Sequence, residues 1–362
     1  MTVSPKIPIK LPIAGLFIPA LFLLATTIAC VYNVYHSFCS PGPLENTVAV
    51  IINRGSDLDD IARILEKAGI VRSAAVFRLG VRMYGMSRKL KAGEFLIQEH
   101  ASAKDIMQIL VNGKTITHSL TIPEGLTSQT VINMINEAPG LIGDPLKPVS
   151  ENGILMPETY HYQYGMSRKD LYQRMRNDMV AFTDKHWKKR KLELPLHSKK
   201  EALTLASIVE KETSKPSEYK KVASVYINRL RKGMKLQADP TVIYAVSGGM
   251  MDLKRSPSYD ELKINSPYNT YVNKGLPPGP ICNPGKGAIE AVMNPVDTDY
   301  IFFVADGKGG HIFTSNFKEH WELAEKWRKI NRRNIIKKRR AERLLKNKTD
   351  GQIPQKRLST GG

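Results

Sequence analysis

Apolar residues follow one another without a charge over a single long stretch, from Leu11 to Tyr32. Lys6 and Lys10 precede this stretch, and no Lys or Arg follows it before Arg54. A helix of about 20 apolar residues can cross the hydrocarbon core of a bilayer, and basic flanks stay on the cytoplasmic side. We therefore expect a cytoplasmic N-terminus at 1–10, a transmembrane helix at 11–32, a linker at 33–44 and an extracytoplasmic remainder.

Short apolar runs then alternate between strand and helix spacing over residues 45–122. Val48 to Ile52 is typical of a strand, and Leu58, Ile61, Ala62 and Leu65 recur at helical spacing. Ser56 with Asp59 predicts the start of that helix, and Gly69 predicts its end. We further expect a helix at 74–84, a strand at 93–97, a helix opened by Ser102 and Asp105 that ends near Gly113, and a strand at 115–122. The pattern predicts a small α/β module.

The next 200 or so residues (123–327) are predicted to form a second domain, mostly helical. Amphipathic spacing predicts helices at 128–136, 169–188, 198–213 and 219–231, and a last helix that begins near Asn316. Tyr300–Val304 and Gly310–Thr314 predict a β-hairpin. The segments 151–160 and 256–287 are rich in Pro and Gly and are expected to be ordered loops. The fold class is therefore α+β.

The formal charge of +20 is concentrated at the C-terminus. From Lys326 to Gly362 there are 14 basic and 2 acidic residues, a net +12, which leaves +8 for the rest. Such a tail at 328–362 is typical of a disordered segment, either simply solvated or bound to an anionic surface. The outward topology argues against nucleic acid as its partner.

The sequence gives no sign of metal or cofactor chemistry. The three cysteines are too few for a disulfide framework. The eight histidines are scattered, without the His-Glu-x-x-His spacing of a zinc site. We therefore expect neither a metal nor a cofactor.

Two carboxylates, Glu210 and Glu212, lie near the end of an apolar helical segment. At about 100° per residue, Glu212 falls close to the centre of the apolar face and Glu210 falls on its flank. A carboxyl group held against apolar surface has a raised pKa and can act as an acid near neutral pH. Glu212 is therefore the candidate acid and Glu210 a supporting residue. The alternative is a structural ion pair between Glu212 and a lysine.

Amide, carboxylate and aromatic side chains gather downstream of this helix. Amides suit the hydroxyl and acetamido groups of a sugar, and aromatic faces suit its C–H surfaces. The same residue types also brace loops. The candidate binding residues are Gln237, Asp239, Tyr268, Asn269 and Tyr271.

Several motifs in this order resemble the MltG (YceG-like) endolytic murein transglycosylases of bacteria. The motifs are Glu210-Lys-Glu-Thr213, Val222-Ala-Ser-Val-Tyr-Ile-Asn-Arg-Leu230, Leu236-Gln-Ala-Asp-Pro-Thr-Val-Ile-Tyr244, Tyr268-Asn-Thr-Tyr271, Gly275-Leu-Pro-Pro-Gly279 and Phe303-Val-Ala-Asp-Gly-Lys-Gly-Gly-His311. The resemblance runs from the apolar segment to about Trp327. It implies a LysM-like module at 45–122, a catalytic domain at 123–327, and Glu212 as the catalytic acid. Glu158 departs from the aspartate expected in its turn, and the basic extension is not a general family feature.

The resemblance also implies a reaction, a location and partners. Glu212 would cleave the MurNAc–GlcNAc bond without water and leave 1,6-anhydro-MurNAc ends. The reaction would need no cofactor. The enzyme would be a single-pass protein of the bacterial inner membrane with a periplasmic catalytic domain. It would act on nascent glycan strands, ending their elongation, beside the peptidoglycan synthases.

Two alternatives stay open from the residues. One is a peptidoglycan hydrolase that pairs Glu212 with Glu158 or Asp239 as a second carboxylate. The other is a non-catalytic glycan-binding scaffold of the wall-synthesis machinery.

Overall fold

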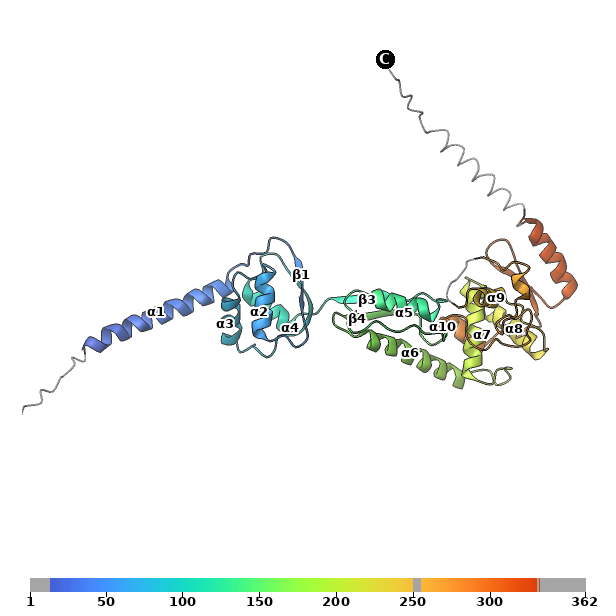
Figure 1. Cartoon of the computed structure of the whole chain (residues 1–362), viewed down its shortest axis with the longest axis horizontal. Helices are drawn as coiled ribbons and strands as arrows, with labels where there is room; N and C mark the ends of the chain where they lie inside the picture. The colour runs from blue at the N-terminus through green and yellow to red at the C-terminus, as the bar shows by residue number, and fades with distance from the viewer. Residues whose placement is uncertain (1–13, 250–254, 331, 333–362) are drawn as a thin grey trace, which may run out of the picture. The chain divides into compact units, whose positions relative to one another are not determined.

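The computed structural model describes residues 14–249, 255–330 and 332 (Figure 1). The predicted cytoplasmic segment 1–10 and the predicted tail beyond 332 lie outside the described residues. The chain divides into two compact units. The first consists of Met1–Ser119, Ala138–Gly143 and His161–Ser167, and the second of Leu120–Glu137, Asp144–Tyr160 and Arg168–Gly362.

Helices and short two-stranded sheets make up the described chain, as expected for an α+β fold. The sheets pair β1 with β2, β3 with β4, and β5 with β6. The elements are α1 (Ala14–Cys39), β1 (Val48–Ile52), α2 (Leu58–Lys67), α3 (Ala74–Met83), β2 (Gly93–Ile97), α4 (Ala103–Asn112), β3 (Thr117–Thr121), α5 (Ser128–Glu137), β4 (Thr159–Gln163), α6 (Arg168–Lys188), α7 (Lys199–Glu212), α8 (Tyr219–Arg231), α9 (Asp239–Val246), α10 (Lys286–Met293), β5 (Phe302–Ala305) and β6 (His311–Thr314). Single 3₁₀ turns lie at Pro216–Glu218 and Glu261–Lys263, and a C-terminal helix covers 317–330.

The first unit packs α2, α3 and α4 around the antiparallel pair β1–β2. The strands and helices predicted between residues 48 and 113 are confirmed, and Ser102 with Asp105 forms the predicted capping box. The predicted start of α2 was wrong by one residue. Asp57, rather than Ser56, accepts the Asp60 amide at 2.8 Å, and Asp60 takes the role predicted for Asp59.

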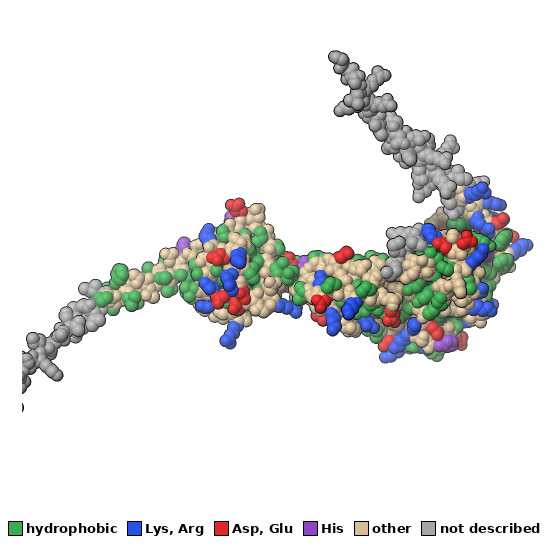
Figure 2. Space-filling view, viewed as in Figure 1, with side chains coloured by type: hydrophobic (Ala, Val, Ile, Leu, Met, Phe, Trp, Pro, Cys, Tyr) green, Lys and Arg blue, Asp and Glu red, His purple; other side chains and the backbone are tan. Residues whose placement is uncertain are grey.

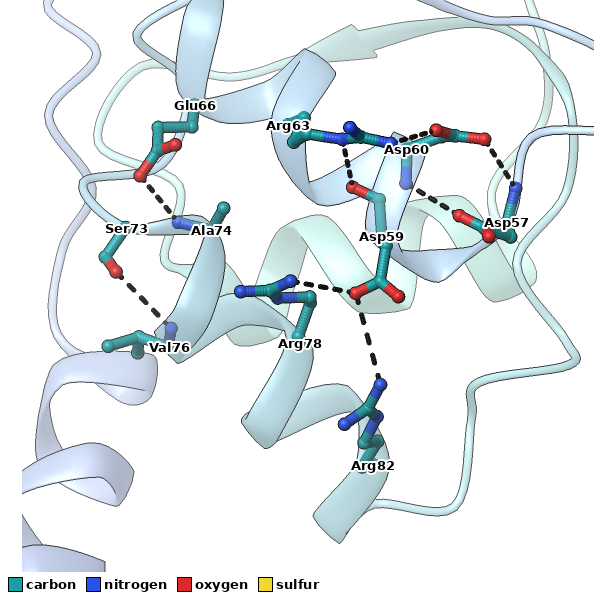
Figure 3. Close-up of polar contacts among 10 residues, drawn as sticks. All are labelled: Asp57, Asp59, Asp60, Arg63, Glu66, Ser73, Ala74, Val76, Arg78 and Arg82. Atoms are coloured by element: carbon teal, nitrogen blue, oxygen red, sulfur yellow. Dashed lines mark hydrogen bonds and ion pairs between the residues drawn. The ribbon is translucent and has the colours of Figure 1, made fainter.

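Asp59 is thereby free to join α2 to α3 (Figure 3). Its carboxylate accepts a hydrogen bond from Arg78 Nη1 at 2.9 Å and lies 4.0 Å from Arg82. Glu66 accepts the Ala74 amide at 2.9 Å, so a side chain of α2 caps the N-terminus of α3. Polar contacts on both sides thus fix the angle between these two helices.

Helix α1 is longer than the predicted transmembrane segment. Its stretch Pro19–Cys39 is long and apolar enough to cross a membrane, by length and composition, with a mean hydropathy of 1.4. The helix continues through residues 33–39, which were predicted to be linker. The reason is Phe38, which is 1% exposed and packs its ring 6.4 Å from that of Phe77 on α3. Burial of this ring extends the helix into the first unit, and the linker begins at Ser40.

The core of the second unit lies between α7, α8 and α10, with α6 against them (Figure 1). Leu205, Ile208 and Val209 of α7 are fully buried there. The helices predicted at 169–188 and 219–231 and the hairpin β5–β6 are confirmed. Ser198 caps α7 by accepting the Glu201 amide at 3.1 Å. The end of α7 is therefore held on a packed helical core.

Three elements of this region were not predicted. β4 lies where a loop was expected to end, α9 follows the Leu236-Gln-Ala turn, and α10 begins within a Gly-rich segment. Each is short, since α9 and α10 have 8 residues each and β4 has only 5, although Tyr160 and Tyr162 of β4 alternate at strand spacing. Tertiary burial, not local propensity, decides such segments.

Replacement of Gly80 tests the docking of α1. An added Cβ would lie 2.2 Å from the Phe38 ring, so Gly80→Ala must displace that ring. We expect a loss of about 1–3 kcal/mol, the usual cost of overpacking a core. Amide hydrogen exchange of α3 in the full-length chain in detergent measures it. Leu79→Ala, at an exposed neighbouring position, is the control, and equal exchange in both variants would contradict the docking.

Candidate active site

Glu212 is the last residue of α7, and its carboxyl group faces a cavity in the second unit. The cavity has a volume of about 290 Å³. Its walls come from α7, α8, the turn before α9, the 271 loop, β5 and the C-terminal helix, which are distant in sequence. The lining residues are Glu212, Tyr226, Arg229, Leu236, Gln237, Asp239, Tyr271, Phe303 and His320.

Burial controls the protonation of Glu212. Burial, with a smaller contribution from the nearby Asp239, raises the pKa of the carboxyl group to about 7, against the opposing effects of the Tyr226 hydrogen bond and the Arg229 charge. Tyr226, on α8, donates a hydrogen bond to Glu212 Oε1 at 2.5 Å. Phe303 packs edge-on against the Tyr226 ring, with ring centroids 6.0 Å apart. Glu212 can therefore hold or release a proton near neutral pH.

Arg229 lines the cavity while it supports the backbone around it. Its Nε donates to Ile301 O and its Nη1 to Leu236 O, both at 2.7 Å. Its guanidinium also lies 5.4 Å from the Phe302 ring centroid. These bonds join α8 to the turn that carries Gln237 and to the start of the β5–β6 hairpin. The residual positive charge lowers the pKa of Glu212.

The structure brings Gln237, Asp239 and Tyr271 together at this cavity. Tyr271 donates its hydroxyl hydrogen to Asp239 Oδ1 at 2.6 Å. Gln237 has a φ of 50°, in the left-handed region that non-glycine residues seldom adopt. The strained turn presents Gln237 and then Asp239 on the same wall, and such strain is concentrated at functional sites.

Tyr268 and Asn269 lie outside the lining of this cavity. Asn269 is fully buried, and its amide donates to Leu262 O and Ile264 O at 3.0 and 2.9 Å. Its Oδ1 accepts the Tyr271 amide at 2.9 Å. Asn269 thus braces the loop that carries Tyr271 and offers a ligand no surface in this structure. The Tyr268 ring packs against that of Tyr244, with centroids 4.7 Å apart.

The other carboxylates of the sequence prediction point elsewhere. Glu210 accepts the Tyr219 hydroxyl and the Gly285 amide, each at 2.9 Å, and so ties α7 to the starts of α8 and α10. Glu158 forms an ion pair with Lys286. Of the proposed second carboxylates, only Asp239 lines the cavity with Glu212. Among the described residues, no group of three or more His, Cys, Asp or Glu is arranged to hold a metal ion.

Four lining residues of the cavity were not predicted from the sequence: Tyr226, Arg229, Phe303 and His320. Tyr226 and Arg229 lie four and seven residues after the start of the Val222–Leu230 motif, at positions that share one face of α8, and this spacing was the available signal. Phe303 opens the hairpin motif. No local pattern distinguished His320, because only the packing of the C-terminal helix brings it to the cavity.

His320 is a neutral polar group at the cavity wall. Its ring stacks on Phe302, with centroids 4.8 Å apart. Burial, and then Arg229 and Arg328, lower the pKa of its imidazole. Its Nδ1 is buried and has no hydrogen-bond partner among the residues that the structure describes. A neutral imidazole offers one donor and one acceptor, which suits the hydroxyl and amide groups of a sugar.

Glu212→Gln is expected to stabilise the protein at pH 8. Because the folded-state pKa of about 7 exceeds the ordinary value of 4.5, ionisation of Glu212 costs stability as pH rises from 4.5 through 7. Glutamine stays neutral and escapes this cost, a gain of up to about 3 kcal/mol. Thermal unfolding at pH 5 and pH 8 measures it. Glu210→Gln, on the same helix, should instead destabilise at both pH values; equal pH dependence in wild type and Glu212→Gln would refute the assignment.

Known proteins resemble this chain over most of its length. The model of the YceG-like family matches residues 50–326. A protein of Bacillus subtilis (strain 168) named endolytic murein transglycosylase is 33% identical over 317 residues, which are 78% of this chain and 85% of the relative. A protein of the same name from Streptococcus pneumoniae (strain D39) is 30% identical over 322 residues, 75% of this chain. The match spans 56% of that longer relative.

A solved structure is also similar in sequence. The crystal structure of a yceG-like protein from Listeria monocytogenes is 30% identical and covers 77% of this chain and 99% of its own, with a TM-score of 0.48. The family match extends from β1 of the first unit through the cavity residues up to His320. The chain therefore belongs to the YceG-like family.

Proposed function

We propose that this chain is an endolytic lytic transglycosylase of peptidoglycan and that Glu212 is its catalytic acid and base. The observation that carries the proposal is a carboxyl group with a pKa of about 7 at the wall of a cavity of about 290 Å³. The names of the relatives support the substrate and the reaction type. A pKa near the working pH lets one group both give and take a proton.

The reaction needs no water. Protonated Glu212 donates its proton to the glycosidic oxygen between MurNAc and GlcNAc, and the bond from that oxygen to C1 of MurNAc breaks. The C6 hydroxyl of MurNAc attacks C1, and its proton passes to the carboxylate of Glu212. The products are a GlcNAc 4-hydroxyl end and a 1,6-anhydro-MurNAc end, with Glu212 protonated as at the start. The second carboxylate of a hydrolase, which activates water, is therefore unnecessary.

The polar residues of the cavity wall orient the sugars. Gln237 and His320 supply hydrogen-bond donors and acceptors for acetamido and hydroxyl groups. Asp239, which raises the pKa of Glu212, holds the Tyr271 hydroxyl and fixes the position of that ring. Tyr268 and Asn269 act indirectly, since their contacts shape the loop that presents Tyr271. Tyr226 adjusts the proton affinity of Glu212.

We place the enzyme in the bacterial inner membrane through α1. The apolar stretch Pro19–Cys39 supports a single-pass anchor, and Lys6 and Lys10 support a cytoplasmic N-terminus. The catalytic domain would then meet nascent glycan strands outside the membrane, near the peptidoglycan synthases, and its cuts would end their elongation. The β1-α2-α3-β2 order of the first unit supports a LysM-like module that binds glycan.

A two-carboxylate hydrolase is the second candidate, because Asp239 lines the cavity with Glu212. The products separate the two reactions. Mass spectrometry of digested sacculi should show anhydro-MurNAc ends for the transglycosylase. Ordinary reducing ends, together with their loss in Asp239→Asn, would establish the hydrolase instead.

Glu212→Gln is expected to reduce glycan cleavage by about 10³-fold or more, because glutamine can neither donate nor accept the proton. Release of anhydro-muropeptides from sacculi measures it, and circular dichroism verifies the fold. Glu158→Gln is the matched control, since Glu158 pairs with Lys286 away from the cavity, and should keep most activity. Full activity of Glu212→Gln would rule out our assignment, and no cleavage by wild type would favour a glycan-binding scaffold.

Tyr226→Phe is expected to move the alkaline limb of the pH–rate profile upward. The Tyr226 hydrogen bond lowers the pKa of Glu212, so its loss raises that pKa and keeps the acid form present at higher pH. The shift should be about one unit or more, since a hydrogen bond to a charged group contributes roughly 1.5–3 kcal/mol. The pH dependence of kcat/KM measures it. Tyr219→Phe removes the equivalent bond to Glu210 and should leave the limb in place; a limb that moves equally in both variants would count against Tyr226.

A further inference from the structure

An exposed aromatic pair marks one face of the C-terminal helix, 317–330. Phe317 and Trp321 are 63% and 52% exposed, and their ring centroids lie 6.4 Å apart. Arg328 places its guanidinium 5.1 Å from the centroid of the Trp321 ring. At about 100° per residue these three side chains fall within about 40° of one another, so they form one stripe. We call Phe317, Trp321 and Arg328 the aromatic stripe.

Positive charge begins where the aromatic stripe ends. Lys326, Arg328 and Lys329 occupy the last turns of the helix and are exposed, and Figure 2 shows Lys and Arg side chains gathered over this end of the chain. The sequence from Lys326 to Gly362 carries 14 basic and 2 acidic residues, a net charge of +12. Apart from Arg328, whose charge lowers the pKa of His320, this charge has no role in the cavity chemistry described above.

The acidic residues of the helix lie off this face or at its edge. Glu319 accepts a hydrogen bond from Thr314 Oγ1 at 2.6 Å and is thereby tied to β6. Glu322 is exposed about 100° from Trp321, and Glu325 is exposed about 40° from Trp321 on the side away from Phe317, at the edge of the stripe. The stripe therefore presents two aromatic rings and a cation to solvent.

We propose that the aromatic stripe and the exposed basic residues beside it, Lys326, Lys329 and Arg332, dock on an anionic lipid bilayer surface. Trp is enriched at the membrane interface, where its ring reaches the acyl boundary and its N–H stays hydrated. Clusters of Lys and Arg next to such a helix bind anionic headgroups. A charged wall polymer would satisfy the basic residues, but it has no apolar phase to cover Phe317 and Trp321. A lipid surface fits both parts of the face.

The consequence is a second attachment of the chain to the membrane. It adds to the proposed span in α1 and does not depend on the reaction at Glu212. Since His320 lies on the same helix and at the cavity wall, docking would hold the cavity close to the membrane surface. Glycan strands near the membrane would then be cut in preference to distant ones.

The test uses the full-length chain in lipid nanodiscs. Trp187→Phe and Trp327→Phe leave Trp321 as the single tryptophan of the three. Brominated lipids should quench Trp321 at least about twofold more strongly in discs containing phosphatidylglycerol than in pure phosphatidylcholine, and high salt should abolish the difference.

Charge variants provide the matched comparison. Lys326→Gln, Lys329→Gln and Arg332→Gln together should remove the lipid-dependent quenching, whereas the same change at the exposed Lys188, Lys189 and Lys232 should not. Cleavage of soluble glycan strands should be equal in both triple variants. The two readouts are independent. If the wild-type chain did not cleave glycan, the proposed function would fail, but the lipid-dependent quenching of Trp321 would still report the docking.

Three results would overturn the proposal. The first is equal access of an aqueous quencher to Trp321 in anionic and neutral discs. The second is protection of Trp321 that rises with protein concentration in detergent, which would assign the stripe to a second copy of the chain. The third is equal protection in neutral discs by a soluble anionic wall polymer.

Discussion

The site depends on one constraint, which is the burial of the Glu212 carboxyl group with a single short hydrogen bond. Tyr226 donates that bond at 2.5 Å, and burial raises the pKa of Glu212 to about 7 despite it. A fully solvated carboxyl group would be ionised at neutral pH. A carboxylate with more hydrogen-bond donors or a cationic partner would have a still lower pKa. The balance between burial and one donor gives a group that exchanges a proton near pH 7.

The packed helices maintain this balance. The end of α7 cannot move toward solvent, because Glu210 bonds to Tyr219 and to the Gly285 amide. Neighbouring glutamates thus divide the work: Glu210 fixes the helix end, and Glu212 faces the cavity. Arg229 is similar, since its bonds to Leu236 O and Ile301 O support the cavity wall while its charge tempers the pKa of Glu212.

Buried loop contacts extend the same organisation to the cavity wall that carries Asp239 and Tyr271. The side-chain amide of Asn269 donates its hydrogen bonds to backbone carbonyls of its own loop. These bonds fix the position of Tyr271, whose hydroxyl donates to Asp239. A residue type that suits sugar recognition can therefore act as a buried support for the cavity wall without contacting a ligand. Composition alone does not separate these two uses, because an amide binds a backbone carbonyl and a sugar hydroxyl with the same geometry.

Sequence periodicity determined the long helices, the β5–β6 hairpin, the apolar N-terminal helix and the orientation of Glu212 relative to Glu210, since each follows from residues close together in the chain. Sequence periodicity did not predict the short elements β4, α9 and α10, and it placed the start of α2 one residue too early. Only the tertiary structure decided that His320 and Phe303 line the cavity with Glu212 and that Asn269 does not. These contacts join segments far apart in sequence, and local spacing carries no record of which distant side chain fills a given place in the core.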